Sequence, residues 1–466
     1  MKLQHLSFAL PVLFLFFTIT SCKKQTDVVN TAQQLTATVD SVANTKKALD
    51  SALMITRDIY FWYNQIPAGF DAQSYTDPNE IMEAIRQYSI EAGFIRPVDK
   101  WSFAIKQKDW ENQSNGIVMN TSTDIIGDFG LTVFFRAEGD LRVRLVEKNS
   151  PAGTAGIHRS WRITKINGNS NINTANSVAI IENVYKSSST TFTFLKPDGN
   201  TVDIILNASA YKTQPVYLDT IYNYSRKKIG YMVFNSFLGD TSEIYNGFER
   251  IFTKFANAGI KDAVIDLRYN GGGYVSVQEQ LADYLVSVSA DNNLMFKKQF
   301  NDKNSAFNSS TNFHKTGPLN LNHLYFIVSN STASASELLI NNLKPYMDVQ
   351  LVGPSNTYGK PVGFFPIAVS DWYIFPVSFK STNKNGVGEY FNGLEVNSKV
   401  ADGLDKDWGD VTESCLASVI RRITTGSYLG QATHEFTDLP QQVKLGNNKL
   451  DAPLFKGAIG STIKLR

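Results

Sequence analysis

Short apolar segments alternate with helical patterns between Lys228 and Val352, and this alternation constrains the fold of the chain more than any other feature. Because helices separate the apolar runs, the pattern predicts an α/β domain, the core of a multidomain chain. The predicted strands are residues 229–237, 262–268, 323–328 and 349–352, and the predicted helices are 242–258, 275–287, 336–344 and 412–425. Residues 291–316, rich in Asn, Ser and Lys, are predicted to be a surface excursion.

A cluster of small hydroxyl residues, Ser331 to Ser336, lies where one predicted strand ends and the next helix begins. The first N–H groups of a helix have no partner within it and carry the positive end of its dipole, so they favour a developing negative charge. A serine at the start of a helix can also be an ordinary N-cap. This stretch alone therefore leaves both a structural and a chemical role open.

Two further turns follow predicted strands. Asp266-Leu267-Arg268 leads into Asn270 and three glycines, whose lack of side chains lets backbone N–H groups face a ligand. Tyr358-Gly359-Lys360 follows the strand that ends at Val352. Taken singly, the first is compatible with a tight turn and the second with a solvated loop lysine. A phosphate-binding loop is a poor interpretation, because no Gly-Lys-Ser/Thr sequence follows the glycines.

The N-terminus has the pattern of an export signal. Lys2 and His5 precede an apolar run, residues 6–19, which is shorter than the roughly 20 residues that a spanning helix needs. The sequence Thr20-Ser21-Cys22 then resembles a bacterial lipobox, which implies a signal peptide over residues 1–22 and a membrane anchor through a lipid on Cys22. A plain signal peptide with an incidental cysteine is the alternative. With Lys23-Lys24 and no acidic run after Cys22, we expect a periplasmic face of the cell envelope.

Composition limits the partners and the domain plan. The 45 basic and 43 acidic residues form no block, so no nucleic-acid partner is indicated. Residues 23–45 are polar and predicted to be a flexible tether, and residues 46–115 a helical domain with a helix capped by Asp77. Cys415 is predicted to be buried and unpaired. Residues 427–466 are predicted to be a loop-like tail without an assigned role.

Residues 117–207 are predicted to form a small β-rich domain. The order Ser150-Pro151-Ala152, Ala155-Gly156-Ile157 and then residues 163–168 resembles a circularly permuted PDZ domain of bacterial proteases. That resemblance implies capture of a polypeptide chain end by strand addition at the backbone of Gly130 and Leu131. Members of the family usually carry Gly-Asp where this chain has Ser160-Trp161, so that turn is a departure.

The three motifs together, behind a PDZ-like segment, resemble those of the tail-specific (C-terminal-processing) serine peptidases. The resemblance extends over about residues 46–425 and gives residues 208–426 the catalytic domain. It implies a nucleophile at Ser334, a general base at Lys360, and an oxyanion hole formed by backbone N–H groups of Ala335 and Gly272. Ser331 and Ser336 then become the candidates for helix capping.

The chemistry of the residues agrees with a Ser-Lys dyad. A serine hydroxyl needs a base to become a nucleophile, and none of the five histidines lies in a hydrolase motif. Burial can lower the pKa of a lysine enough for it to act as that base. No metal, nucleotide or other cofactor is implied. One departure is Phe364, which stands where many relatives have a glutamine that orients the lysine. Two alternatives to an active peptidase stay open: a peptide-binding relative without activity and an enzyme of the crotonase type.

Overall fold

The structure is a computed structural model that describes residues 27–119, 126–224, 227–428, 440–450 and 455–462. The predicted signal peptide and Cys22 lie outside these residues. The chain divides into two units, Met1–Lys47 and Ala48–Arg466, and helix α1 (Asp27–Ile59) runs from one into the other. Helix α1 covers the predicted tether, residues 23–45, from Asp27 onward, in a segment with neither Gly nor Pro to interrupt a helix, and the flexible tether stays a prediction. Within the described segments no helix has the length and apolar character to span a bilayer.

Residues 48–118, which cover most of the predicted helical domain, contain several short helices and two short strands. The elements after α1 are η1 (Tyr63–Gln65), η2 (Ala72–Ser74), α2 (Pro78–Ile85), β1 (Phe103–Lys106), α3 (Gln107–Ser114) and β2 (Ile117–Val118). The Asp77 side chain accepts a hydrogen bond from the backbone N–H of Glu80, which confirms the predicted cap of α2. Strand β1 pairs with β19 (Trp372–Phe375), so this region shares its core with residues near Lys360.

The β-rich region is one antiparallel sheet in the order β3-β4-β5-β6-β7, with β3 at an edge. Its elements are β3 (Leu131–Ala137), β4 (Asp140–Val146), α4 (Pro151–Thr154), β5 (Arg162–Ile166), η3 (Thr174–Asn176), α5 (Ser177–Tyr185), β6 (Ser189–Leu195) and β7 (Thr201–Asn207). Ser160 stands where members of the family usually carry a glycine. Its φ of 79° gives it the left-handed conformation that a glycine adopts easily. The assignment of the β-rich region as a PDZ domain stays a prediction.

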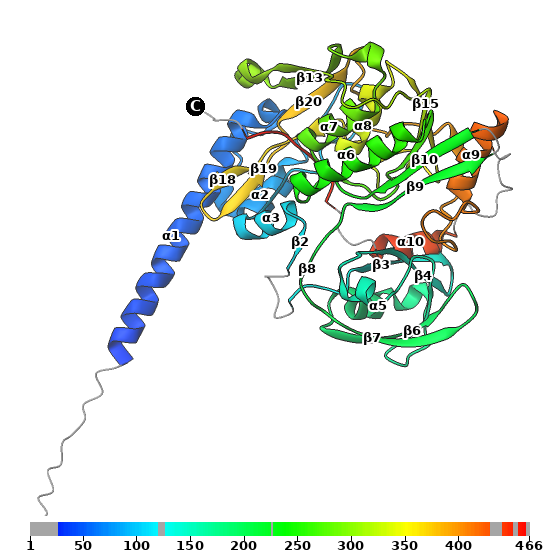
Figure 1. The fold of residues 1–466 in the computed structure, drawn as a ribbon. Helices are drawn as coiled ribbons and strands as arrows, with labels where there is room; N and C mark the ends of the chain where they lie inside the picture. The colour runs from blue at the N-terminus through cyan, green and yellow to red at the C-terminus, as the bar shows by residue number, and fades with distance from the viewer. Residues whose placement is uncertain (1–26, 120–125, 225–226, 429–439, 451–454, 463–466) are drawn as a thin grey trace, which may run out of the picture. The chain divides into compact units, whose positions relative to one another are not determined.

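A six-stranded sheet in the order β21-β16-β15-β11-β10-β9 forms the centre of the α/β region (Figure 1). All neighbouring pairs are parallel except β9 with β10. The strands are β9 (Val216–Tyr224), β10 (Lys227–Phe234), β11 (Asp262–Asp266), β15 (His323–Ile327), β16 (Asp348–Gly353) and β21 (Ser398–Lys399), and β8 (Tyr211–Lys212) pairs with β2. The alternation in the sequence therefore produces the mixed α/β fold that it predicts.

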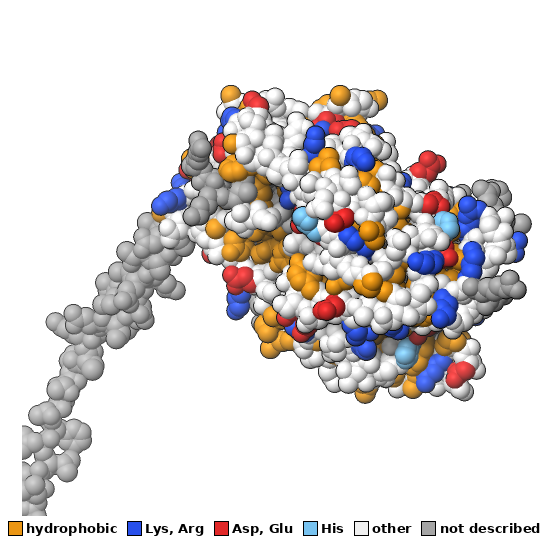
Figure 2. Space-filling model, turned by 45° about the horizontal axis from the view of Figure 1, so that its top comes forward, with side chains coloured by type: hydrophobic (Ala, Val, Ile, Leu, Met, Phe, Trp, Pro, Cys, Tyr) orange, Lys and Arg blue, Asp and Glu red, His pale blue; other side chains and the backbone are white. Residues whose placement is uncertain are grey.

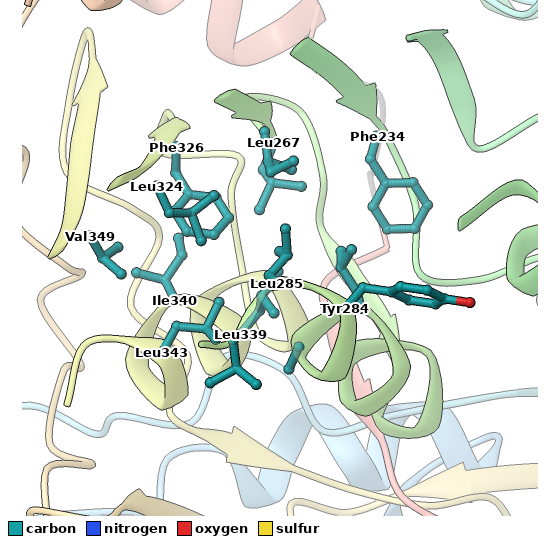
Figure 3. Close-up of a cluster of buried hydrophobic side chains, with 14 of the residues drawn as sticks. Phe234, Leu267, Tyr284, Leu285, Leu324, Phe326, Leu339, Ile340, Leu343 and Val349 are labelled. Atoms are coloured by element: carbon teal, nitrogen blue, oxygen red, sulfur yellow. The ribbon is translucent and has the colours of Figure 1, made fainter. Parts of the chain in front are cut away.

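Helices cover both faces of this sheet. The helices are α6 (Thr241–Asn257), α7 (Val275–Leu285), α8 (Ala335–Leu343) and α9 (Ser414–Thr425), with the short η4 (Val288–Ala290) after α7. Leu324 and Phe326 of β15 pack with α7 and α8 in one cluster, which includes Leu339 and Ile340 of α8 (Figure 3). Tyr325 points to the other face and packs with α9, where Cys415 is fully buried as predicted. The burial of α8 on all sides fixes the position of its N-terminus.

Two segments differ from their predictions. The excursion at 291–316 contains β13 (Leu294–Phe300), η5 (Asp302–Phe307) and β14 (Ser309–Asn312), and its apolar residues Met295, Phe296 and Phe313 are fully buried. Strand β13 pairs with β20 (Phe379–Asn383), which follows β17 (Val362–Gly363) and β18 (Ile367–Val369). The predicted loop-like tail contains α10 (Gln441–Leu450) and β22 (Gly457–Ile459), because Val443, Leu450 and Ile459 find buried sites in the folded chain.

Candidate active site

The three predicted motifs follow three neighbouring parallel strands. Strand β11 precedes the glycine turn, β15 precedes Ser334, and β16 precedes Lys360. Carboxyl ends of parallel strands lie at the same edge of a sheet, which is where open α/β sheets bind ligands. Hydrogen bonds join the three loops: Ala333 N–H donates to Asn270 O at 3.0 Å, and Tyr358 N–H donates to Thr332 O at 2.9 Å.

Ser334 occupies the N-cap position of α8, and its backbone is strained. Its φ of 60° and ψ of −109° lie outside the regions that residues with a side chain favour. Such strain persists only where the surrounding structure enforces it, and it is concentrated at functional sites. The Ser334 side chain is buried, and its Oγ has no hydrogen-bond partner among the residues that the structure describes. Ser334 therefore takes the cap position predicted for Ser331 or Ser336, in the sequence pattern of a capping box in which the Glu337 side chain accepts from the Ser334 N–H.

Lys360 is buried, and no carboxylate of the described residues contacts its amine. Burial lowers the pKa of Lys360 well below its usual range, although the more distant charges of Asp99 and Glu337 oppose the shift. Its Nζ donates a hydrogen bond to the backbone oxygen of Lys456 at 2.8 Å. The ring of Phe364 lies 3.7 Å from Nζ, so the residue that replaces the expected glutamine forms one wall around the amine. A buried lysine with a lowered pKa can hold the neutral amine that a general base requires.

Glu337 connects the serine to the lysine through their backbones. Its Oε2 accepts hydrogen bonds from the N–H of Ser334 and the N–H of Lys360, both at 2.8 Å. Its Oε1 accepts from Thr357 Oγ1 at 2.5 Å and from the N–H of Gly359 at 2.7 Å. Glu337 is fully buried, and burial raises its pKa despite these four bonds. One carboxylate thus positions both candidate catalytic residues, a role that the sequence motif does not reveal.

The two predicted oxyanion donors lie close together. A Cβ built on Gly272 would be 3.0 Å from Ala335 N and 2.4 Å from Gly457 O, so only glycine fits at this position. Ala335 is the first residue of α8, where N–H groups have no partner within the helix. The N–H of Gly272 donates to Asn270 Oδ1 at 2.9 Å. An oxyanion would share that N–H with the Asn270 side chain, and the oxyanion hole stays a prediction.

The predicted peptide-binding loop lies at the start of β3. Gly130 has a φ of 71°, and its N–H donates to Asp128 Oδ1 at 2.7 Å. Leu131 is buried and pairs with Val146 of β4. A cavity of about 740 Å³ extends from Asp128 to Gly271 and Gly272, which places the β-rich region and the glycine turn around one hollow. Phe455 of the tail also lines this cavity.

The histidines of the described chain stand away from Ser334. His323 begins β15, at the opposite end of that strand from Ser334, and its Nδ1 lies 2.6 Å from Asp262. His158 is exposed and its Nδ1 lies 3.0 Å from Asp407. Since Ser334 Oγ has no hydrogen-bond partner among the described residues, no histidine contacts it. Lys360 remains the candidate base.

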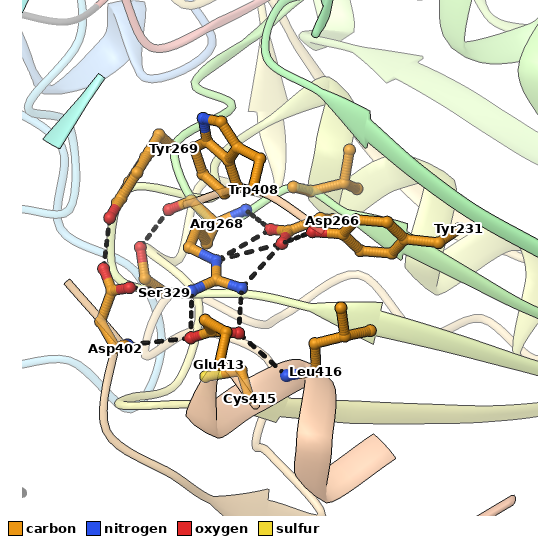
Figure 4. A network of polar contacts seen from close by, with 12 residues as sticks. Tyr231, Asp266, Arg268, Tyr269, Ser329, Asp402, Trp408, Glu413, Cys415 and Leu416 are labelled. Carbon is orange, nitrogen blue, oxygen red and sulfur yellow. Dashed lines mark hydrogen bonds and ion pairs between the residues drawn. The ribbon is translucent and has the colours of Figure 1, made fainter. Parts of the chain in front are cut away.

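Arg268, the charged residue of the first motif, has a structural environment (Figure 4). Its guanidinium donates to Asp266 at 2.7 Å, to Asp402 at 2.8 Å and to Glu413 at 2.9 and 3.0 Å. Asp266 and Glu413 are buried with it, whereas Asp402 is partly exposed. Arg159, which follows α4 in the β-rich region, contacts the same Asp402 at 2.6 Å. These ion pairs join the β-rich region to the central sheet, and the sequence analysis missed Arg159, Asp402 and Glu413.

Comparison with known proteins shows to which family and to which fold the chain is similar. Residues 228–395 match the model of peptidase family S41. Probable CtpA-like serine proteases of Staphylococcus saprophyticus and Staphylococcus aureus are 25% identical over 242 residues and 23% identical over 319 residues, respectively, or 51% and 66% of this chain. The chain spans 46% and 62% of the length of these relatives. A solved structure of a putative S41 protease from Bacteroides fragilis has a TM-score of 0.64 and 20% identity, over 80% of this chain and 96% of that one.

Proposed function

We propose that the chain, which carries a domain of peptidase family S41, is a serine endopeptidase. The match to this family confirms the resemblance drawn from the three motifs. The observation that carries the proposal is the arrangement around Glu337: a strained serine with an unbonded hydroxyl and a buried lysine of lowered pKa, both held by one carboxylate. This arrangement suits acyl transfer by a Ser-Lys dyad.

In the proposed reaction, neutral Lys360 takes the proton of Ser334 as Oγ attacks the carbonyl carbon of a substrate peptide bond. The N–H groups of Ala335 and Gly272 stabilise the tetrahedral oxyanion, where one such donor is typically worth about 10²–10³ in rate. Protonated Lys360 then gives its proton to the leaving amine, and water hydrolyses the acyl-enzyme with Lys360 again as base. The reaction requires the Lys360 amine to turn toward Ser334, since its hydrogen bond in the structure goes to Lys456 O.

The proposed substrates are unstructured or C-terminal regions of exported polypeptides. Support comes from the edge position of β3 beside Gly130 and Leu131, because an extended chain can extend a sheet only at an edge. Further support comes from the cavity that extends from Asp128, two residues before this loop, to Gly271 and Gly272 of the glycine turn, because a bound chain could lie in it. Basic and acidic side chains are both spread over the face shown in Figure 2, which fits a polypeptide rather than a nucleic-acid partner.

We further propose that a lipid on Cys22 anchors the enzyme to a membrane of the cell envelope, on the periplasmic side. The support is the apolar run and the cysteine that follows it. Metabolic labelling with radioactive palmitate in a bacterial host tests this step. The wild type should incorporate label and a Cys22→Ala variant should not.

Digestion of β-casein by the purified protein tests the peptidase proposal. The wild type should release fragments, and Ser334→Ala should release none while keeping the same far-ultraviolet circular dichroism. The competing function is peptide binding without hydrolysis, which is favoured by Phe364 in place of the orienting glutamine and by the bond from Lys360 to Lys456. Equal, background-level digestion by the wild type and Ser334→Ala would favour that function instead.

A further inference from the structure

The described part of the C-terminal tail occupies two surfaces that an incoming polypeptide would need. Strand β22 lies beside the glycine turn, and α10 lies on the edge strand β3. The proposed function uses neither element. The contacts of β22 and α10 indicate what these two surfaces would bind if the tail left them.

Strand β22 is held as an extended peptide would be. It pairs in parallel with β12 (Gly272–Tyr274), where the N–H of Gly457 donates to Gly271 O at 3.1 Å. On its other side the N–H of Phe364 donates to Ala458 O at 3.1 Å, and the N–H of Gly460 donates to Phe364 O at 2.8 Å. These are main-chain bonds, so this slot recognises an extended backbone rather than a particular sequence.

Side chains next to this strand add specific contacts. The rings of Phe103 and Trp110 lie 6.2 and 5.6 Å from the ring of Phe455, centroid to centroid, and form an aromatic pocket for it. The next residue, Lys456, places its Nζ 3.8 Å from the centroid of the Tyr358 ring. Its backbone oxygen accepts the hydrogen bond of Lys360 Nζ. The tail therefore binds the candidate base directly, and that amine donates to the tail rather than to Ser334.

Helix α10 covers the other surface. Asn447 Nδ2 donates to Phe135 O at 2.9 Å, and Asn447 Oδ1 accepts from Phe135 N–H at 2.8 Å, so the amide replaces a strand partner at the edge of β3. Val443 and Leu450 on the same helix are buried in the core of the β-rich region. An added strand on β3 would have to displace these contacts.

We propose that the slot between β12 and Phe364 binds an extended polypeptide through an aromatic anchor, and that residues 455–460 fill it as an internal inhibitor. The inhibitory part rests on the proposed peptidase function, whereas the binding part does not. An attached segment competes at an effective concentration in the millimolar range, as is typical of short tethers. A substrate must therefore exclude the tail before Ser334 and Lys360 can meet.

Peptide binding to full-length Ser334→Ala variants tests the proposal without any need for turnover. The probe is a fluorescein-labelled peptide with the sequence of residues 455–462, followed by fluorescence anisotropy. A second substitution, Ile459→Asp, places a carboxylate at a site that is 3% exposed and should release β22. The matched control is Leu445→Asp, on α10 but 52% exposed. We expect the Ile459→Asp protein to bind the probe at least tenfold more tightly than the control, and a probe with alanine in place of Phe455 to bind more weakly.

Equal affinity of the folded Ile459→Asp protein and the Leu445→Asp control would overturn the proposal. Should Ile459→Asp fail to fold, Phe455→Ala replaces it, since this half-buried side chain contributes less to the core. If that variant also unfolds, the tail is an integral part of the core and the proposal is wrong. With Ser334 restored, Ile459→Asp should digest β-casein faster than the control. Tight probe binding without any digestion would leave the slot in place and contradict the peptidase function alone.

Discussion

Two buried cationic side chains of this protein have opposite surroundings. Arg268 contacts the carboxylates of Asp266, Asp402 and Glu413. The Lys360 amine contacts a backbone oxygen and an aromatic ring, but no carboxylate within the described part of the chain. Both side chains follow strands of the same sheet, and both are about 1% exposed.

The effect on ionisation separates a structural charge from a chemical one. Burial alone would raise the pKa of Asp402, but the nearby guanidinium groups of Arg159 and Arg268 lower it below its usual value. The acidic groups near Lys360 do not offset the effect of burial, so the pKa of Lys360 falls. A paired charge stays charged and holds the fold together, whereas an unpaired one gives up its proton and becomes available as a base.

Removal of Arg268 should have the largest effect on stability. An Arg268→Leu variant leaves Asp266 and Glu413 buried without their cation, and breaking such a pair typically costs about 3–5 kcal/mol. The control is Arg250→Leu, whose side chain is 59% exposed and pairs with Asp219 at the surface, where a pair is worth about 1 kcal/mol or less. Denaturant unfolding of the two variants measures the difference; similar losses would refute the structural role of Arg268.

Replacement of Lys360 should have the opposite effect on stability. Lys360→Met should lower activity by about 10²–10⁴-fold, the usual contribution of a general base, yet raise the free energy of unfolding at neutral pH. The unfolded chain binds a proton between the depressed folded pKa and the unfolded value of about 10.4, whereas the folded wild type does not. The wild type therefore gains stability as pH rises through this window, and the advantage of the methionine variant should shrink. A constant advantage across this range would contradict a depressed pKa.

Glu337→Gln should separate positioning from chemistry. The amide nitrogen of glutamine would face either the backbone N–H groups of Ser334 and Lys360 or the N–H of Gly359 and the hydroxyl of Thr357. The resulting shift of the dyad should reduce kcat by about 10²-fold, the loss typical of a 1 Å misplacement, with a smaller change in KM. Steady-state kinetics on a peptide substrate measure this split. A change confined to KM would assign Glu337 to substrate binding.

Phe364→Leu should have the smallest effect and sharpen the description of the amine. The Phe364 ring favours the ammonium form through a cation–π contact worth about 0.5–2 kcal/mol. Its loss should lower the pKa of Lys360 further and move the acid limb of the kcat/KM profile to lower pH. Phe365→Leu is the control, since that buried ring packs in a separate cluster with Phe300. Equal shifts of the acid limb in both variants would show that the Phe364 ring has no specific effect on the pKa of Lys360.

The sequence predicted the elements of the central sheet and proposed a candidate dyad, but it could not provide long-range partners. Strand and helix periodicity located α6, β11 and β15, and the register of the motifs distinguished Ser334 from its hydroxyl neighbours. The partners of Arg268 could not be found, because Asp402 and Glu413 lie 134 and 145 positions away. The role of Glu337 depends on backbone N–H groups, which every residue type except proline carries.

The tail shows a second limit of the sequence. Helix α10 contains Gly446 and several polar residues, and such a segment has little tendency to form a helix by itself. Its buried side chains, Val443 and Leu450, pack on the β-rich region and stabilise it. Tertiary burial overrides local preference here.

The rate at which a fluorophosphonate labels Ser334, measured against pH with peptide mapping of the adduct, tests the Ser-Lys account most directly. We predict one adduct, on Ser334, that forms more slowly as pH falls through the depressed pKa of Lys360 and is nearly lost in Lys360→Met. An adduct on another residue, or an unchanged labelling rate in Lys360→Met, would contradict the dyad.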